Sequence, residues 1–330
     1  MYKRWFEFVC VFGLVVLFPM TLVSIVPNPD HDVTPASTVS RIEESKLEEI
    51  VAPTVEITKE IKVTVLDGDC VEEMELETYI LHVVLGEMPA SFELEALKAQ
   101  AVVARTYTMR RQDGNTKHKQ AAVCTDSSCC QAYKTPVAYI TAGGQVSDIE
   151  KVKRAVTETQ GKVLTYNGEL IEATYFSCSG GLTEDAAAVW GKEIPYLQAT
   201  PSPGEENAKY YVDTVYFSTQ TFEELLGWDI AGSPSTWFGG ITYTNGQGVD
   251  TIQIGGKTYK GTQLRQLLDL RSTAFIITAI GDTIVVTTKG FGHRVGMSQY
   301  GADAMAVNGS DYRQILAHYY KDTSLVSIID

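Results

Sequence analysis

The chain has 330 residues, which is enough to bury a large core in one large domain or two smaller ones. Hydrophobic residues make up 44% and charged residues 21% of the chain, as in ordinary globular proteins. The formal net charge of -14 argues against nucleic acid as a partner, because the phosphate backbone requires a basic face. The same charge disfavours an anionic membrane surface as a docking site for the folded part.

The N-terminal segment predicts a membrane anchor. After Lys3 and Arg4, residues 5–26 form an apolar run with a single charge, Glu7. This run is long enough to cross a bilayer, whereas a cleaved signal peptide has a shorter apolar region and a small-residue cleavage site. The two basic residues would hold the N-terminus in the cytoplasm. We therefore expect residues 1–26 to be a cytoplasmic stub and single transmembrane helix, with the remaining chain outside the cell membrane.

An acidic linker and a folded domain are expected after the anchor. Residues 27–60 are polar, acidic and interrupted by prolines, as in a tether. Residues 61–68 predict a strand that ends in an Asp-Gly turn, and an amphipathic helix is expected from about Val71 to Leu85. Ser91 is a candidate N-cap for a second helix that ends near Arg111. Alanines on both faces of this second helix predict that it is buried between two layers.

The C-terminal half mixes helices with hairpins. A predicted capping box at Ser147 begins a helix that ends near Thr159. Residues 162–176 predict a hairpin with an Asn-Gly type I′ turn. Residues 201–270, richer in glycine and aromatics, form a more variable subregion. We therefore expect residues 61–330 to form an α+β domain, a mixture of helices and strands with β-hairpins, behind the transmembrane helix.

The loop of residues 112–136 contains a cluster of soft metal ligands. His118, Cys124 and Cys130 are spaced evenly by six residues, and imidazole with thiolates is a zinc combination. Adjacent cysteines rarely bind one ion easily, so Cys130 is preferred, with water or Cys129 as the fourth ligand. The alternative is one disulfide and a spectator thiol. However, the cysteines beyond the anchor are odd in number, which fits a disulfide framework poorly.

A glycine-rich loop near the C-terminus, KGFGHRVGMSQYGA at residues 289–302, is a second candidate site. Glycines at this density let a backbone pass close to a ligand, and polar groups between them can line a cleft. The alternative is a tight turn around a packed His293. In the stretch YFSCSGGLTED, from Tyr175 to Asp185, Cys178 could act as a nucleophile beside a histidine, but small residues before two glycines more often shape a turn.

Glu87 lies at the joint between the first two predicted helices, in the stretch VVLGEMPASFE at residues 83–93. One interpretation is a solvated residue in a loop, which is where most carboxylates are found. The other is a half-buried acid with a chemical role. The local pattern alone leaves both interpretations open.

Three stretches in this order resemble the stage II sporulation protein D family of membrane-anchored, murein-cleaving enzymes from endospore-forming bacteria. They are GEMPASFELEALKAQAVVARTY at residues 86–107, YFSCSGGLTED at 175–185 and GFGHRVGMSQYGA at 290–302. The resemblance extends from about Ile61 to the end of the chain and is weakest over residues 201–270. The family also contains relatives called amidase enhancers.

The resemblance implies that Glu87 is the catalytic acid/base of a lytic transglycosylase. It implies substrate contacts for the family's polar positions, which are Lys98, Gln100, Arg105, Ser177, His293, Ser298, Gln299 and Tyr300. Arg294 departs from the glycine more often found after the histidine. A zinc-ligand pattern found in part of the family is matched by His118, Cys124 and Cys130, which implies a structural Zn²⁺. The implied partners are peptidoglycan glycan strands, a sporulation amidase or endopeptidase and a membrane scaffold protein, all acting in engulfment at the septal membrane.

A lytic transglycosylase needs only one carboxylate, because a hydroxyl of the substrate attacks in place of water. The acid must be protonated near neutral pH, so its pKa must be raised by partial burial, for which Met88 and Pro89 could supply an apolar wall. Gln100, Gln299 and Tyr300 would position sugar or acetamido groups, and Arg105 would be either structural or substrate-facing. Two other functions fit the sequence: a zinc-dependent wall amidase or peptidase, and a non-catalytic murein-binding module that enhances a partner amidase.

Overall fold

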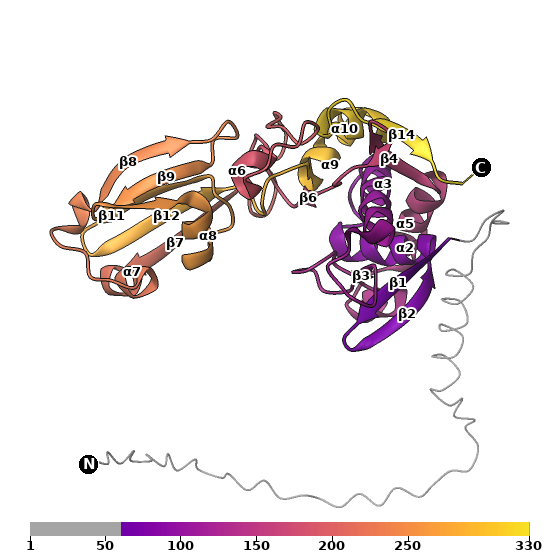
Figure 1. The fold of residues 1–330 in the computed structure, drawn as a ribbon, viewed down its shortest axis with the longest axis horizontal. Helices are drawn as coiled ribbons and strands as arrows, with labels where there is room; N and C mark the ends of the chain where they lie inside the picture. Colours follow the sequence, from indigo (N-terminus) through magenta and orange to yellow (C-terminus); the bar gives the residue numbers. More distant parts are fainter. Residues whose placement is uncertain (1–60, 330) are drawn as a thin grey trace, which may run out of the picture. The chain divides into compact units, whose positions relative to one another are not determined.

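A computed structural model describes residues 61–329 of the chain. Helices and strands are interleaved along these residues, which agrees with the predicted mixture of both (Figure 1). Two hydrophobic cores form, one around helices and one between short antiparallel sheets. Within residues 61–329 no helix has the length and apolar character needed to cross a bilayer. The predicted anchor at residues 1–26 and linker at 27–60 lie outside the described residues.

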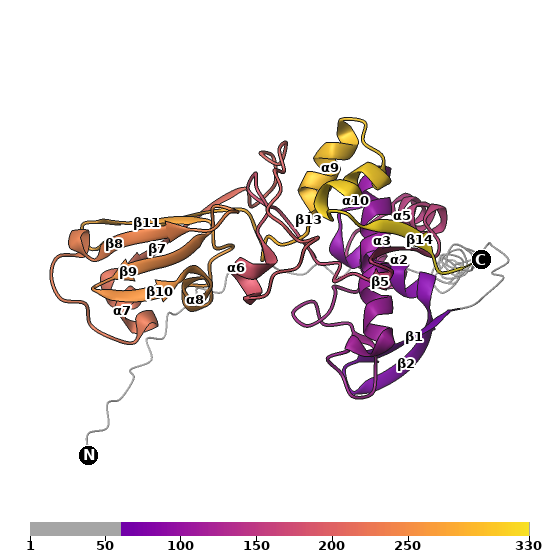
Figure 2. The ribbon, with the colours of Figure 1, turned by 45° about the horizontal axis from the view of Figure 1, so that its top comes forward.

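The first core, which we call the helical core, surrounds helix α3 (Leu94–Arg110). The alanines of α3 at positions 96, 99, 101 and 104 are fully buried, so neighbouring helices can approach closely. Figures 1 and 2 show other helices beside α3, in agreement with the predicted burial of this segment. These neighbours are α2 (Leu76–Glu87), α5 (Val146–Glu158), α9 (Gln299–Val307) and α10 (Tyr312–Tyr319).

The chain enters this core through a hairpin. Strand β1 (Lys62–Asp67) pairs antiparallel with β2 (Cys70–Glu75) and parallel with β3 (Val123–Cys124). The prediction of a helix from Val71 is therefore wrong for its first turn. The helix begins instead at Leu76, because Glu75 acts as its N-cap. The Glu75 carboxylate accepts hydrogen bonds from the backbone N–H of Glu77 at 2.9 Å and of Thr78 at 2.6 Å.

Two helix starts also differ from the sequence prediction. The N-cap of α3 is Glu93 rather than Ser91, and the capping box of α5 is formed by Gln145 and Asp148. The predicted hairpin turn is confirmed: Asn167 and Gly168 both have positive φ, at 52° and 84°, between β4 and β5. The strands of this sheet are β4 (Lys162–Tyr166), β5 (Glu169–Leu170) and β14 (Ser324–Ser327).

The second core, which we call the strand core, lies between two three-stranded sheets and helices α7 (Thr219–Leu226) and α8 (Gly261–Leu267). The first sheet has the order β11-β12-β7 and consists of Phe275–Ile280, Thr283–Lys289 and Val212–Ser218. The second has the order β10-β9-β8 and consists of Lys257–Lys260, Val249–Ile254 and Phe238–Tyr243. The remaining short elements are η1 (Arg111–Asn115), α4 (Pro136–Thr141), β6 (Tyr175–Phe176), α6 (Ala186–Trp190), η2 (Pro234–Thr236) and β13 (Met297–Ser298).

Candidate active site

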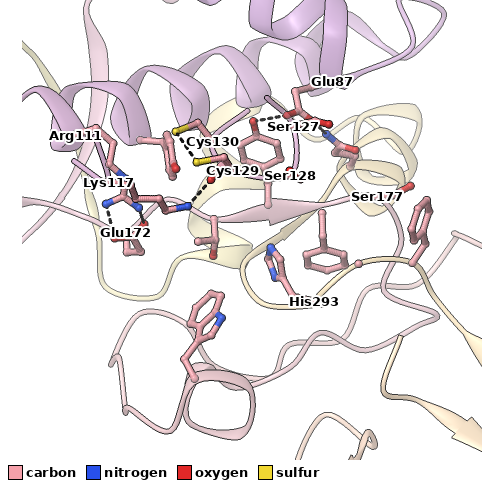
Figure 3. Close-up of a pocket in the computed structure, with 18 residues that line it drawn as sticks. Glu87, Arg111, Lys117, Ser127, Ser128, Cys129, Cys130, Glu172, Ser177 and His293 are labelled. Atoms are coloured by element: carbon pink, nitrogen blue, oxygen red, sulfur yellow. Dashed lines mark hydrogen bonds and ion pairs between the residues drawn. The ribbon is translucent and has the colours of Figure 1, made fainter. Parts of the chain in front are cut away.

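A cavity of about 900 Å³ opens at the C-terminal end of α2 (Figure 3). Its size is within the range of ligand pockets in enzymes. Figure 3 shows Glu87 and the adjacent Cys129 and Cys130 on one side of this cavity and His293 on another. Ser177 and Gln299 also line it. Residues separated by more than two hundred positions in the sequence thus meet at one concave surface.

Glu87 is the last residue of α2 and is half-buried at the wall of the cavity. Its Oε1 accepts hydrogen bonds from the backbone N–H of Ala132 at 2.6 Å and the hydroxyl of Tyr175 at 3.0 Å. The side-chain amide of Gln299 lies 3.5 Å from Oε2. Gly86 permits this approach, because a Cβ at that position would lie 2.9 Å from the carbonyl carbon of Ala132.

The environment of Glu87 raises the pKa of its carboxyl group above the ordinary value. Burial is the largest cause, since it penalises the charged form. The hydrogen bonds from Ala132, Tyr175 and Gln299 act in the opposite direction and do not cancel the effect of burial. The direction is the one expected for a carboxylic acid that donates a proton near neutral pH.

The apolar surroundings of Glu87 differ from those expected. Met88 turns into the helical core, where it is 3% exposed, and Pro89 is exposed to solvent. Neither residue lines the cavity. The aromatic side chains of Tyr107, Tyr175 and Phe176 line it instead.

The buried side-chain amide of Gln131 holds Tyr175, the tyrosine that contacts Glu87, in position. Gln131 is 1% exposed, and its Oε1 lies 3.2 Å from the Tyr175 hydroxyl, whose single proton is shared between Gln131 and Glu87. Its Nε2 donates to Thr108 at 3.1 Å and to the hydroxyl of Tyr79 at 3.4 Å. Gln131 therefore reaches Glu87 through Tyr175, while the next residue, Ala132, reaches it directly.

His293 lines the cavity from the glycine-rich loop. Its pKa is lowered to about 4, first by burial and second by the positive charge of Arg265. The imidazole is therefore neutral at physiological pH. The Nδ1 atom accepts a hydrogen bond from the backbone N–H of Val295 at 3.1 Å, which assigns the ring proton to Nε2.

Arg294 supports the fold of the glycine-rich loop and does not line the cavity. It has a left-handed φ of 65° and is 2% exposed. Its guanidinium donates to the backbone carbonyls of Ser179 at 2.8 Å, Leu182 at 2.6 Å and Gly246 at 2.7 Å. The carboxylate of Glu184 lies 4.0 Å away. These contacts explain how an arginine is accommodated where the resemblance leads one to expect glycine.

The structure brings together some of the predicted site residues and not others. Glu87, Ser177, His293 and Gln299 line one cavity, together with Cys129 and Cys130. Ser298 instead caps α9, where its Oγ accepts from the N–H of Gly301 at 3.2 Å. The ring of Tyr300 packs edge-on against the ring of Phe92, with the two ring centroids 4.9 Å apart.

The polar residues of α3 are also placed away from the cavity. Lys98 forms ion pairs at 2.6 and 2.5 Å with Glu95 and Glu158. Gln100 is 0% exposed, and its side-chain amide has no hydrogen-bond partner within residues 61–329. Arg105 is also 0% exposed and pairs with Glu77. Of the two roles that the sequence leaves open for Arg105, its position is that of a structural residue.

Sequence reasoning did not single out Tyr175, Gln131 or the backbone of Ala132. For Tyr175 a signal exists, because alternate residues of a strand point to the same face and Ser177 was a candidate. No comparable signal exists for Ala132, whose contribution is a backbone amide. Cys178 is fully buried, its Sγ lies 3.2 Å from Glu205, and burial raises the pKa of its thiol. These features do not fit a nucleophile.

A second carboxylate, that of Glu172, lines the cavity and is already hydrogen-bonded to two arginines. Its Oε1 accepts a short hydrogen bond from Arg111, and its Oε2 accepts bonds at 3.2 Å from both Arg110 and Arg111. Both of its oxygens therefore face guanidinium groups. By contrast, no basic side chain is paired with Glu87 within the described part of the chain.

The four predicted metal-binding residues converge beside the cavity. One ligand atom from each of His118, Cys124, Cys129 and Cys130 lies within 4.8 Å of the others. The Nε2 of His118 is 3.4 Å from the Sγ of Cys130 and 3.6 Å from that of Cys129, and the two sulfurs are 4.0 Å apart. All cysteines between residues 61 and 329 are free, which excludes a disulfide among them.

These separations fit one tetrahedral ion. Zinc bonds of about 2.3 Å to sulfur and 2.0 Å to nitrogen place neighbouring ligand atoms roughly 3.5–3.8 Å apart. Cys129 lies almost as near to His118 as Cys130 does, so the adjacent cysteines can both be ligands. A set of three thiols and one imidazole would leave no open coordination position, as in structural zinc sites.

Together, the fold and cavity define a mixed helix-and-strand protein with a half-buried acid and a cluster of metal-type ligands beside it. A family model described as stage II sporulation protein matches residues 67–166. Stage II sporulation protein D of Bacillus subtilis (strain 168) is 42% identical over 260 residues, covering 77% of this chain and 75% of the relative. The counterpart from Bacillus amyloliquefaciens has the same identity and coverage. An amidase enhancer of B. subtilis is 31% identical over 303 residues, covering 74% of this chain and 40% of the relative. The chain therefore belongs to the stage II sporulation protein D family, which is involved in sporulation.

Proposed function

We propose that this protein is a peptidoglycan lytic transglycosylase and that Glu87 is its acid/base. The observation that carries the proposal is a half-buried glutamate with a raised pKa at the wall of a cavity of about 900 Å³. The substrate would be the glycosidic bond from N-acetylmuramic acid to N-acetylglucosamine. The products would be a new glucosaminyl end and a 1,6-anhydromuramoyl end.

In the proposed reaction, Glu87 first donates its proton to the glycosidic oxygen as the bond from that oxygen to the anomeric carbon breaks. The 6-hydroxyl oxygen of the same muramoyl residue then bonds to the anomeric carbon, and its proton passes to the Glu87 carboxylate. The acid is thereby regenerated and no water is consumed. Ala132 and Tyr175 would hold the carboxyl group in place, and Gln299 would stabilise its ionised form.

The state of Glu172 favours this intramolecular reaction over hydrolysis. A hydrolytic glycosidase uses a second carboxylate either as a nucleophile or as a base that activates water. Both oxygens of Glu172 already accept hydrogen bonds from Arg110 and Arg111. A carboxylate held in this way is poorly suited to either task, whereas a transglycosylase requires neither.

A structural Zn²⁺ held by His118, Cys124, Cys129 and Cys130 is part of the proposal. When bound, the ion would fix the loop whose Ala132 amide contacts Glu87. The closed set of four ligands argues against the alternative of a zinc-dependent amidase or peptidase, because a catalytic zinc keeps an open position. We further propose that the protein acts at the engulfing membrane, anchored by residues 1–26, with a partner amidase and a membrane scaffold protein.

A second candidate function is enhancement of a partner amidase without catalysis, favoured by the relative named amidase enhancer. The two are distinguished by incubating the full-length protein in detergent with purified peptidoglycan, both intact and amidase-treated. Mass spectrometry would then quantify anhydromuramoyl ends. We expect such ends with the wild type and with a Glu172→Gln control that folds, but none with Glu87→Gln. No anhydro ends from the wild type, together with faster release of peptides by an added amidase, would establish the enhancer instead.

A further inference from the structure

A second cavity of about 470 Å³ adjoins the cavity that contains Glu87. Trp190, the last residue of α6, and His293 line both cavities. The far side of the second cavity is formed by α8 and the segment after it, including Arg265 and Thr273. The two cavities therefore meet at Trp190 and His293, whose ring centroids lie 5.5 Å apart.

Hydrogen bonds join the two sides of the second cavity, which are the glycine-rich loop and the segment after α8. The N–H of Gly292, beside His293, donates to the carbonyl of Arg271 at 3.0 Å. The hydroxyl of Ser272 donates to the carbonyl of Lys289 at 2.6 Å. Because these bonds join the glycine-rich loop to the segment after α8, the spacing between His293 and α8 is set by the fold.

Arg265 is a cation without a full set of partners in this cavity. Its Nε donates to the carbonyl of Leu270 at 3.3 Å. Its two terminal amino groups make no hydrogen bond or ion pair with any residue from 61 to 329. Burial lowers the pKa of Arg265, and the nearby charge of Asp269 only partly opposes this effect. The guanidinium nevertheless stays charged in water, and its fork of donors matches a carboxylate.

Other features of the cavity suit a sugar that bears such an acid. Trp190 is 44% exposed and lines both cavities, so part of its aromatic surface is accessible to a ligand. Aromatic faces can bury the apolar face of a sugar ring while its hydroxyl groups remain solvated. Gln266 and Thr262, together with Thr273, add neutral polar groups to the lining.

We infer that the second cavity is a carboxylate-binding subsite of the glycan groove, with Arg265 binding the acid and Trp190 supporting the sugar. The inference rests on the proposed function, since peptidoglycan is the substrate considered. Its sugars acquire carboxylates only through the lactyl ether of N-acetylmuramic acid. The acid bound by Arg265 is thus either the free lactyl carboxylate of a glycan without peptides or a carboxylate of the attached peptide.

Binding measurements with full-length Glu87→Gln protein test the subsite without requiring turnover. Isothermal titration calorimetry would use three soluble probes: amidase-treated glycan, glycan with intact peptides, and an N-acetylglucosamine oligomer that lacks any carboxylate. Adding Arg265→Gln should weaken binding of at least one carboxylate-bearing probe by about 10-fold or more, the effect of a lost charge-assisted contact. Binding of the neutral oligomer should change by less than about 2-fold. The probe that loses affinity identifies the source of the acid.

Two controls complete the test. Arg313→Gln removes the same charge from an exposed site on α10, where the side chain is 64% exposed, and should leave all three affinities unchanged. Arg265→Lys keeps the charge but loses the fork, so its affinities should lie between those of the protein with Arg265 intact and those of the Arg265→Gln variant. Melting temperatures would confirm that each variant folds. The proposed subsite would be contradicted if Arg265→Gln left the affinities for both carboxylate-bearing probes unchanged. It would also be contradicted if Arg265→Gln weakened binding of the neutral oligomer as much as binding of those probes. Carboxylate-dependent binding without any anhydro product from the wild type would instead overturn only the transglycosylase.

Discussion

The ion pair between Arg105 and Glu77 provides a direct test of whether Arg105 supports the fold or binds substrate. The Nε of Arg105 donates to Oε1 of Glu77 at 2.9 Å, and one terminal amino group donates to Oε2 at 2.5 Å. A second terminal amino group reaches the carbonyl of Lys162 at 3.1 Å. Arg105 is 0% exposed and the Glu77 side chain is 17% exposed, so neither charge is well solvated.

Replacing Arg105 by Met leaves a poorly hydrated Glu77 carboxylate to which, among residues 61–329, only the N–H of Gly161 still donates, at 3.2 Å. Breaking a buried pair in this way costs about 3–5 kcal/mol. At about 2–4 °C per kcal/mol for a large domain, the melting temperature should fall by roughly 6–20 °C. Glu77→Gln should lower the free energy of unfolding by a similar amount, because it leaves the fully buried guanidinium of Arg105 without its counter-charge. The double variant should be more stable than the sum of the two effects predicts, with a coupling of about 1–3 kcal/mol.

Differential scanning calorimetry of the four proteins measures this coupling, and glycan affinity is measured well below the lowest melting temperature. We expect all four proteins to bind glycan equally, because Arg105 does not line either cavity. Unchanged stability of Arg105→Met together with a loss of glycan affinity would refute the reasoning and return Arg105 to the substrate-contacting residues.

Three further predictions concern the proposed acid and the ligand cluster. Tyr175→Phe removes a hydrogen bond of about 1.5–3 kcal/mol from the Glu87 carboxylate, so the rate of anhydro-end formation should fall by roughly 10- to 100-fold. The loss of a donor to the charged form should also move the alkaline limb of the pH–rate profile to higher pH, and an unchanged rate and profile would contradict the assigned contact. Because the folded pKa of Glu87 lies above its unfolded value, the protonated form favours folding, and stability is lost as the pH rises from the unfolded pKa through the folded one. The melting temperature of Glu87→Gln relative to wild type should therefore increase across that interval and be constant on either side of it; a constant difference throughout would contradict the raised pKa. Cys129→Ser should reduce the zinc measured by elemental analysis and lower the melting temperature, whereas the exposed Cys70→Ser should change neither; equal zinc contents would exclude Cys129 as a ligand.

Local patterns predicted those parts of the fold that depend on neighbouring residues. The Asn-Gly turn of the β4–β5 hairpin requires positive φ at two adjacent residues, and this demand is visible in the sequence. The burial of α3 follows from alanines on both of its faces. The start of α2 was misplaced because the run from Val71 to Glu75 also fits a helix, and its pairing with β1 depends on tertiary contacts.

At the site, the sequence pointed to side chains with distinctive chemistry. It did not reveal groups that matter only because the fold brings them next to a partner. The six-residue spacing drew attention to three residues that lie in the cluster, and the surrounding glycines drew attention to His293, which lines the cavity. Arg105 and Glu77 are 28 residues apart, so nothing in the local pattern shows that they are partners. The same is true of Ala132, whose backbone amide meets Glu87 across 45 residues.

The contact between Ala132 and Glu87 also bears on why the metal-type cluster and the acid lie in one site. Cys130 and Ala132 are two residues apart, and the peptide that links Ala132 to Tyr133 passes so close to Gly86 that a Cβ would not fit there. Gln131, between them, orders Tyr175, which is the second donor to Glu87. Movement of this segment would therefore disturb two of the contacts that orient the acid. An ion that fixes Cys129 and Cys130 would therefore act on the proposed reaction through the position of Glu87.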